Sequence, residues 1–241
     1  MFLLSDEEKQ KLIAGIESAF SVPFIDDIED FIWEAIFAYT KSIPLLDPLT
    51  VIRSKRLFDL VDPATNIGWS AKALQCPIHP GLGFELVIQR ADIFKKSDEL
   101  GFPQLSVNSP TDQLGAALLT HWNYFKVEQD MAFQGVTDPR VCILLKSKKR
   151  NQFAYYEDIL ERHMTSEIDW KWSDASRTGL QGIRRSDLFA KYRWYPNQKQ
   201  FFERFVLPSD AEILSLSPQR IPLSDVIDML KLKLATIQSN S

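Results

Sequence analysis

The sequence predicts a mixed α/β fold (α+β mixed) in which a central mixed β-sheet is flanked by helices. Three observations indicate it. The first forty residues have helical apolar spacing, short β-rich runs follow, and the chain then alternates between strand and helix patterns. With 241 residues, of which 45% are hydrophobic, the chain is within reach of one large domain, so we expect a single domain over residues 1–241.

Two amphipathic helices are expected at the N-terminus, within residues 5–42. Leu12 and Ile16 recur at the spacing of one helix face, and a similar pattern runs from Phe24 to Thr40. Pro44 then ends the helical pattern, because proline lacks the N–H that a helix interior needs.

A core over residues 50–147 is expected to follow, beginning with a β-hairpin at Phe58–Gln75. The two arms of the hairpin are separated by Asp-Pro-Ala-Thr-Asn, a turn composition. The run from Phe84 to Phe94 is expected to be a strand that leads into a helix. A helix is predicted within Ser109–Phe133, and the continuous apolar run Arg140–Ser147 is typical of a central strand.

An aromatic and basic segment occupies residues 148–208, and a final helix is predicted over 222–237. The net charge is −4, which argues against a protein that coats nucleic acid indiscriminately. The charge is nevertheless uneven. The first fifty residues carry ten acids and three bases, whereas Arg140–Arg204 carries fourteen bases and eight acids. This asymmetry suggests one basic face, although a merely solvated surface remains the alternative.

A loop around Thr178-Gly-Leu-Gln-Gly182 is the candidate DNA-recognition element. The loop is too sparse in glycine for a phosphate cradle, but its side chains are of the types that contact guanine and adenine edges in the major groove. The candidate DNA-binding residues are Arg177, Gln181, Arg184, Arg185 and Lys199. The alternative is a charged surface loop without a ligand.

Cysteine content and hydropathy indicate a cytoplasmic protein. Cys76 and Cys142 form no CxxC pair and have no histidine cluster nearby, so neither a disulfide framework nor a zinc site is expected. No run approaches the length of a membrane span, and the start turns acidic at once instead of continuing as a secretory apolar region. We therefore expect no membrane partner.

The hairpin carries opposite charges on its two arms. Residues two apart in a strand share a face, so Asp59 points away from its apolar neighbours, and Ser70 and Lys72 point away from Trp69 and Ala71. We expect these three polar groups to meet. A carboxylate and an ammonium on one side of a sheet can hold Mg²⁺ and orient a water beside a phosphodiester, with Asp59 as metal ligand and Lys72 stabilising the transition state. The alternative is a structural ion pair.

The order of elements and charges resembles the PD-(D/E)XK nuclease superfamily. Helices precede a strand with Asp59, a short turn follows, and the next strand carries Ser70-Ala71-Lys72. The resemblance covers about residues 25–145, and the closest likeness is to type II restriction endonucleases. It implies a restriction-endonuclease-like core and Mg²⁺-dependent cleavage of double-stranded DNA at a specific short site. It also implies a DNA methyltransferase of matching specificity as functional partner. A homodimer is expected because palindromic sites mirror two-fold symmetry.

One departure from the family pattern concerns the metal site. Ser70 stands where the family has an acid, so another carboxylate must complete the site. Glu85 is the best candidate for this second metal ligand beside Asp59, provided that its run packs beside the second hairpin arm. Gln89 is a weaker alternative, and Glu34 on the second helix is a candidate outer-shell ligand.

Two other functions remain open at this stage. The first is a catalytically inactive DNA-binding protein that keeps the nuclease-like fold, which the serine favours. The second is a nuclease of another role, in repair or branched-DNA cleavage. Histidine-metal nuclease and protease chemistry is not expected, because His79, His121 and His163 are far apart in the sequence and His121 fits a packed helix face.

Overall fold

The computed structural model describes residues 2–44, 56–147 and 151–239, and it is a mixed α/β structure with two β-sheets. The expected class is therefore confirmed, whereas the expectation of one central sheet was incomplete. Residues 50–55 of the predicted core and 148–150 of the predicted recognition segment lie outside the described residues.

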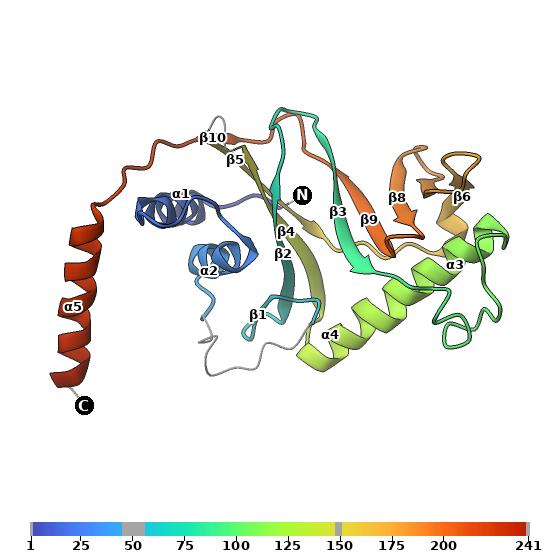
Figure 1. Cartoon of the computed structure of the whole chain (residues 1–241), viewed down its shortest axis with the longest axis horizontal. Coiled ribbons are helices and arrows are strands. Elements are labelled where there is room, and N and C mark those ends of the chain that lie inside the picture. Colours follow the sequence, from blue (N-terminus) through green and yellow to red (C-terminus); the bar gives the residue numbers. More distant parts are fainter. Residues whose placement is uncertain (1, 45–55, 148–150, 240–241) are drawn as a thin grey trace.

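Helices occupy both ends of the described chain and its middle (Figure 1). They are α1 (Asp6–Ser21), α2 (Asp30–Lys41), α3 (Thr111–Trp122), the π-helical segment η1 (Asn123–Glu128), α4 (Gln129–Gln134), the 3-10 helix η3 (Thr165–Glu167) and α5 (Leu223–Ser239). The strands are β1 (Leu60–Asp62), β2 (Ile67–Gln75), β3 (Gly83–Arg90), β4 (Asp138–Ser147), β5 (Gln152–Ile159), β6 (Ile168–Trp172), β7 (Leu180–Arg184), β8 (Ala190–Tyr195), β9 (Gln200–Val206) and β10 (Ile213–Ser215).

The first sheet is mixed and has the strand order β1-β2-β4-β5-β10. Among the described strands of this sheet only β2 and β4 are parallel, and the chain between them makes the long crossover that parallel neighbours require. Helices α1 and α2 cover one face of this sheet (Figure 1). Phe37 of α2 lies edge-on to Trp69 of β2 at a centroid distance of 5.5 Å. The expected apolar face of the second hairpin arm, Trp69, Ala71 and Ala73, is the one that packs on these helices.

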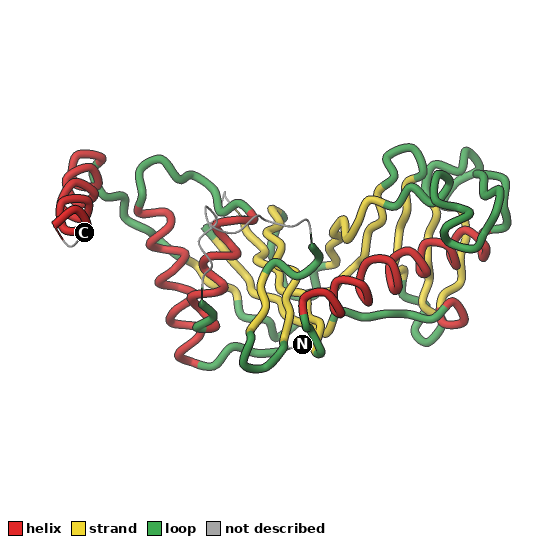
Figure 2. Tube along the Cα trace, turned by 90° about the horizontal axis from the view of Figure 1, so that it is seen from below, coloured by secondary structure: helices red, strands yellow, loops and turns green. Residues whose placement is uncertain are grey.

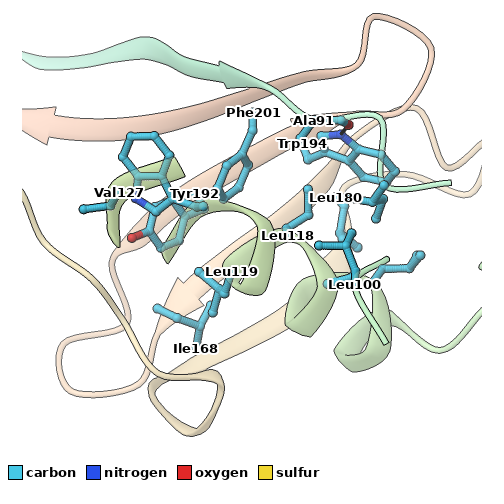
Figure 3. Packing of buried hydrophobic residues seen from close by; sticks show 14 of the residues in the cluster. Ala91, Leu100, Leu118, Leu119, Val127, Ile168, Leu180, Tyr192, Trp194 and Phe201 are labelled. Atoms are coloured by element: carbon cyan, nitrogen blue, oxygen red, sulfur yellow. Dashed lines mark hydrogen bonds between the residues drawn. The ribbon is translucent and has the colours of Figure 1, made fainter. Parts of the chain in front are cut away.

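The second sheet is antiparallel and has the order β3-β9-β8-β7-β6. The helix α3 crosses its inner face, as Figures 1 and 2 show from two directions. Leu118 and Leu119 of α3 meet Tyr192 and Phe201 of the strands (Figure 3). Gly115 allows α3 to lie close to the sheet, because a Cβ there would stand 2.2 Å from the indole of Trp170.

The two sheets meet through an apolar layer between β3 and β9 of the second sheet and β4 and β5 of the first. Phe84 of β3 lies edge-on to Tyr156 of β5 and stacks on Phe205 of β9. Because Phe84 and Leu86 alternate with Glu85 along the strand, this packing fixes which residues of β3 face the first sheet.

The predicted elements differ from the structure in two segments. The N-terminal helices, the hairpin, the central strand and the C-terminal helix are confirmed. Phe84–Phe94 begins as the strand β3, but turns follow it where a helix was expected. Leu180–Arg184, expected to be part of a loop, is the strand β7, because its side chains alternate between the core and the outside. Among the described helices, none combines the length and apolarity of a membrane span.

Candidate functional site

The hairpin turn is held by Asp62, the last residue of β1. Its carboxylate accepts the Ala64 N–H at 2.9 Å and the Thr65 hydroxyl at 2.6 Å. The hydrogen bond from Thr65, and to a lesser extent that from Ala64, lowers the pKa of Asp62 below its usual value. Asn66 takes the left-handed conformation at φ 56° that asparagine tolerates in turns. The turn therefore sets the register that aligns the two arms.

Asp59 and Lys72 meet where the pairing of β1 with β2 ends. The Asp59 N–H donates to the Trp69 carbonyl at 2.9 Å, and Leu60 pairs with Trp69, so Asp59 lies beside Trp69 and Ser70 of the second arm as expected. Its Oδ2 accepts the Ala71 N–H at 2.8 Å and the Lys72 ammonium at 3.0 Å. The two side chains are 21% and 32% exposed, so the pair remains accessible from outside. The expected meeting of these two groups is confirmed; a role in catalysis remains a prediction.

A second carboxylate, which the sequence did not single out, lies further along the same edge of β2. Asp30, the first residue of α2, accepts the Ala73 N–H through Oδ1 at 3.0 Å. The N–H groups of Ala71 and Ala73 point to the same side of the strand and are about 7 Å apart. Asp59 and Asp30 thus accept successive N–H groups of β2 beyond the end of β1, which brings two acids from distant segments to one strand edge.

Ser70 lies on the same face of β2 as Lys72, opposite the face of Trp69 and Ala71 that packs on the helices, and it is 5% exposed. It lines a cavity of about 20 Å³ between the two sheets, together with Lys72, Leu86, Trp122 and Glu203. A space of this size holds about one water molecule and no part of a nucleotide. A large substrate would therefore reach Lys72 from the exposed side of the hairpin and not through this cavity.

The expectation that Glu85 packs beside the second hairpin arm is wrong. Its strand β3 pairs with β9 in the second sheet, and Glu85 points to the face opposite Phe84 and Leu86, which pack against the first sheet. Its carboxylate lies 3.4 Å from the guanidinium of Arg193. The alternation of β3 thus directs Glu85 away from the hairpin.

The two weaker metal-ligand candidates have separate positions. Gln89 is buried, and its Oε1 lies 2.8 Å from Nδ1 of His121, so it belongs to the core of the second sheet. Glu34 lies one helical turn after Asp30 on α2, and both line an open depression with Ala73 of β2. Glu34, expected as an outer-shell ligand, thus lines the same depression as Asp30.

The metal-binding capacity of the hairpin edge is limited. Within the described residues, no group of three or more His, Cys, Asp or Glu side chains is close enough to hold a metal ion. Both hydrogen bonds that Asp59 accepts go to Oδ2, and Oδ1 accepts none from the part of the chain that the structure describes. This donor set fits a cation such as Mg²⁺, which keeps several waters and is often anchored by one or two carboxylates.

The structure does not bring the predicted DNA-binding residues together. Arg177 precedes β7 and donates to the Val107 carbonyl and Asn108 Oδ1, while Arg184 and Arg185 lie at the opposite end of that strand. Ion pairs hold the remaining cations: Arg184 with Asp187 at 2.7 Å, Arg185 with Asp169 at 2.7 Å and Lys199 with Asp92 at 2.6 Å. The Arg184 guanidinium lowers the pKa of Asp187 to about 2. The predicted loop cluster is therefore wrong as a single surface.

Gln181 instead belongs to a row of side chains across the outer face of the second sheet. Cross-strand register aligns Lys171, Gln181, Arg193, Phe202 and Val87 from five neighbouring strands. All five are partly or fully exposed, because alternate residues of each strand face α3 and the core. Lys171 and Arg193 were not singled out from the sequence, although the alternation in Lys191–Tyr195 and Gln200–Arg204 could have indicated an outer face.

Aromatic groups accompany the cations on this outer face. Tyr195 lies edge-on to Phe202 at a centroid distance of 5.5 Å, and the Tyr195 hydroxyl lies 3.3 Å from the Arg193 guanidinium. Glu85 supplies the acid beside Arg193. Lysine, glutamine, arginine and aromatic side chains in one row can contact phosphates, base edges and base faces.

In comparisons with known proteins, no family model, no curated protein and no solved structure matches this chain.

Proposed function

We propose that this protein is a Mg²⁺-dependent endonuclease that hydrolyses phosphodiester bonds in double-stranded DNA at a specific short site, in the manner of type II restriction endonucleases. The observation that carries the proposal is the pairing of Asp59 with Lys72 at the exposed end of the hairpin. The order of elements supports it: helices precede the Asp59 strand, the Lys72 strand follows a short turn, and a long crossover leads to the parallel strand β4.

The chain's own groups have distinct roles in this proposal. Lys72 places positive charge beside the scissile phosphate, where negative charge grows in the transition state. Asp59 holds the lysine through Oδ2 and keeps Oδ1 for a cation or a water. Asp30 replaces Glu85 as the proposed second acid, because it is anchored to the same edge of β2. Ser70 is left with a packing role at the cavity between the sheets.

Asp59 and Asp30 are the residues that would hold Mg²⁺, with Glu34 in the outer shell. When bound, the ion supplies Lewis acidity and lowers the pKa of a water molecule. The two carboxylates would also accept hydrogen bonds from that water, and the Lys72 ammonium would take the place of a second cation.

The outer row of the second sheet is the proposed DNA-contacting surface. Lys171 and Arg193 would contact phosphates or guanine edges, and Gln181 is suited to adenine. A homodimer would place two such surfaces on a palindromic site, and a DNA methyltransferase of matching specificity in the same cytoplasm would protect host DNA.

A catalytically inactive DNA-binding protein is the second candidate, and the position of Glu85 favours it. The acid expected to replace Ser70 points away from the hairpin, and the described residues contain no three-ligand cluster. In this alternative the Asp59–Lys72 pair serves only to close the end of the hairpin.

Cleavage of plasmid and genomic DNA by the purified full chain distinguishes the two candidates. We expect discrete fragments with Mg²⁺, none with a chelator, and none with Asp59→Asn. Asp98→Asn is the control, because this exposed acid lies outside the hairpin. DNA binding by the wild type without Mg²⁺-dependent or Mn²⁺-dependent cleavage would support the inactive protein instead.

A further inference from the structure

The C-terminal helix α5 stands away from both sheets in the two views of the fold (Figures 1 and 2). Val226 is its one buried residue among those whose side chains are described. Large apolar side chains are nevertheless frequent along it. A helix of this length is marginal in water unless an apolar face is packed against a partner.

The exposed apolar residues of α5 contain a heptad repeat. They follow one another at spacings of four, three, four and three residues, and they are 43–64% exposed: Leu223, Ile227, Leu230, Leu234 and Ile237. In a heptad this is the alternation of d and a positions that forms one seam along a helix. Such a seam is complementary to another helix with the same repeat.

The complementary helix does not come from the described part of the same chain. The apolar faces of α1, α2 and α3 are already buried in the two cores, as Leu12, Phe37 and Leu118 illustrate. These three helices thus do not supply the complement, whereas a second copy of this chain supplies an identical seam.

The charges of α5 permit pairing with a copy of itself. Between Leu223 and Ile237 the helix carries two acids, Asp225 and Asp228, and two bases, Lys231 and Lys233. Lys231 flanks the seam and is paired with Asp228 of its own helix at 3.0 Å. A strongly charged helix would demand a partner of opposite sign, whereas this one has no net charge and does not repel its copy.

We propose that α5 is a dimerisation element, in which the seam of Leu223, Ile227, Leu230, Leu234 and Ile237 pairs with the same seam of a second copy. This inference does not depend on whether the hairpin cleaves DNA. The seam is about 21 Å long at 1.5 Å per residue, so a pair of such seams buries less area than the interfaces of obligate dimers. The dimer should therefore dissociate on dilution.

Sedimentation velocity of the full chain over a range of concentrations tests the proposal. We expect wild type to pass from monomer to dimer as concentration rises. Leu230→Asp, which places a charge in the seam, should weaken dimerisation at least about tenfold. Leu232→Asp is the matched control, because Leu232 is 71% exposed on the opposite side of the same helix, and it should dimerise like wild type.

Circular dichroism in the near ultraviolet verifies that the two sheets stay folded in each variant, since their aromatic cores do not involve α5. A wild type that remains monomeric at every concentration would overturn the proposal. Equal loss of dimer in Leu230→Asp and Leu232→Asp, or full retention in both, would also overturn it, because the seam would then not be the interface. DNA cleavage is not used as a readout, so the outcome is separate from that of the proposed function.

Discussion

The carboxylate of Asp59 and the ammonium of Lys72 are 3.0 Å apart at the point where the hairpin stops pairing and β2 continues alone. The pair thus occupies an exposed strand edge, where N–H groups of β2 would otherwise lack a partner from β1. Asp59 serves both as acceptor for the Ala71 N–H and as partner for the lysine. This double role allows either a catalytic or a purely structural interpretation, and the two make different predictions.

Lys72→Ala should abolish cleavage while DNA binding remains, because the lysine stabilises charge in the transition state more than it holds the ground state. Folding stability should change by no more than about 1 kcal/mol, since the partly exposed pair contributes little. Cleavage assays, binding titrations and denaturant unfolding check the three parts. Lys95→Ala, a change of an exposed lysine outside the site, is the control. Full cleavage by Lys72→Ala would show that the hairpin does not take part in the reaction.

Asp30→Asn should reduce Mg²⁺-dependent cleavage strongly, whereas Glu85→Gln should leave the cleavage rate nearly unchanged. The reason is position: Asp30 is bound to the edge of β2, and Glu85 faces Arg193 on the second sheet. The asparagine can still accept the Ala73 N–H, so the fold is kept while the charge is lost. Rates measured over a series of Mg²⁺ concentrations decide between them. A larger loss of cleavage rate with Glu85→Gln would instead support Glu85, the acid predicted from the sequence, as the second metal ligand.

Arg193→Ala and Lys171→Ala should each weaken DNA binding, by about 1 to 3 kcal/mol where the side chain contacts a base. A phosphate contact would instead weaken cognate and scrambled duplexes alike and reduce the salt dependence of binding. Arg185→Ala is the matched comparison, because this arginine, like Arg193, has an acidic partner but lies beyond the end of β7 and outside the outer row. Competition binding at two salt concentrations separates the cases. If Arg185→Ala has the larger effect, the recognition surface lies at the end of β7 and not on the outer row.

His121 should remain neutral well below neutral pH, because burial and then Lys96 and Lys126 lower its pKa to about 4. The unfolded chain binds this proton near the ordinary histidine value of about 6.5. The unfolded state therefore holds more protons between pH 6.5 and 4, and the stability that His121 contributes is lost as the pH falls through this window. The free energy of unfolding, measured at pH 7, 6 and 5, tests this expectation. Its slope with pH should be smaller in His121→Phe. An equal slope in both proteins would contradict this assignment.

The sequence predicts the local structure of this protein better than the arrangement of its strands. Apolar spacing was sufficient for α1 and α2, and the turn residues around Asp62 were sufficient for the hairpin register. The contact between Asp59 and Lys72 follows from that register, since both residues belong to one hairpin. Each of these features depends on residues close in the chain.

Contacts between distant segments could not be predicted in the same way. The partner of β3 is β9, more than a hundred residues later, and nothing in the alternation of Glu85 with its neighbours identifies that partner. Asp30 was missed for the same reason, because its contact with Ala73 joins a helix start to a strand edge. The arginines around Gly182 were expected in a loop because glycine favours turns, whereas this glycine lies in β7 against the Trp170 ring.

The parallel pairing of β2 with β4 has a consequence for how the chain reaches its native state. Ile67 is aligned with Asp138, and the intervening chain includes β3, whose own partner β9 ends at Val206. Neither sheet can be completed from a contiguous half of the protein, and closing such long loops is slow. During synthesis, a nascent chain that stops before β9 would expose the edge of β3. We therefore expect ribosome-bound chains shorter than about 206 residues to be cleaved faster in limited proteolysis than longer ones.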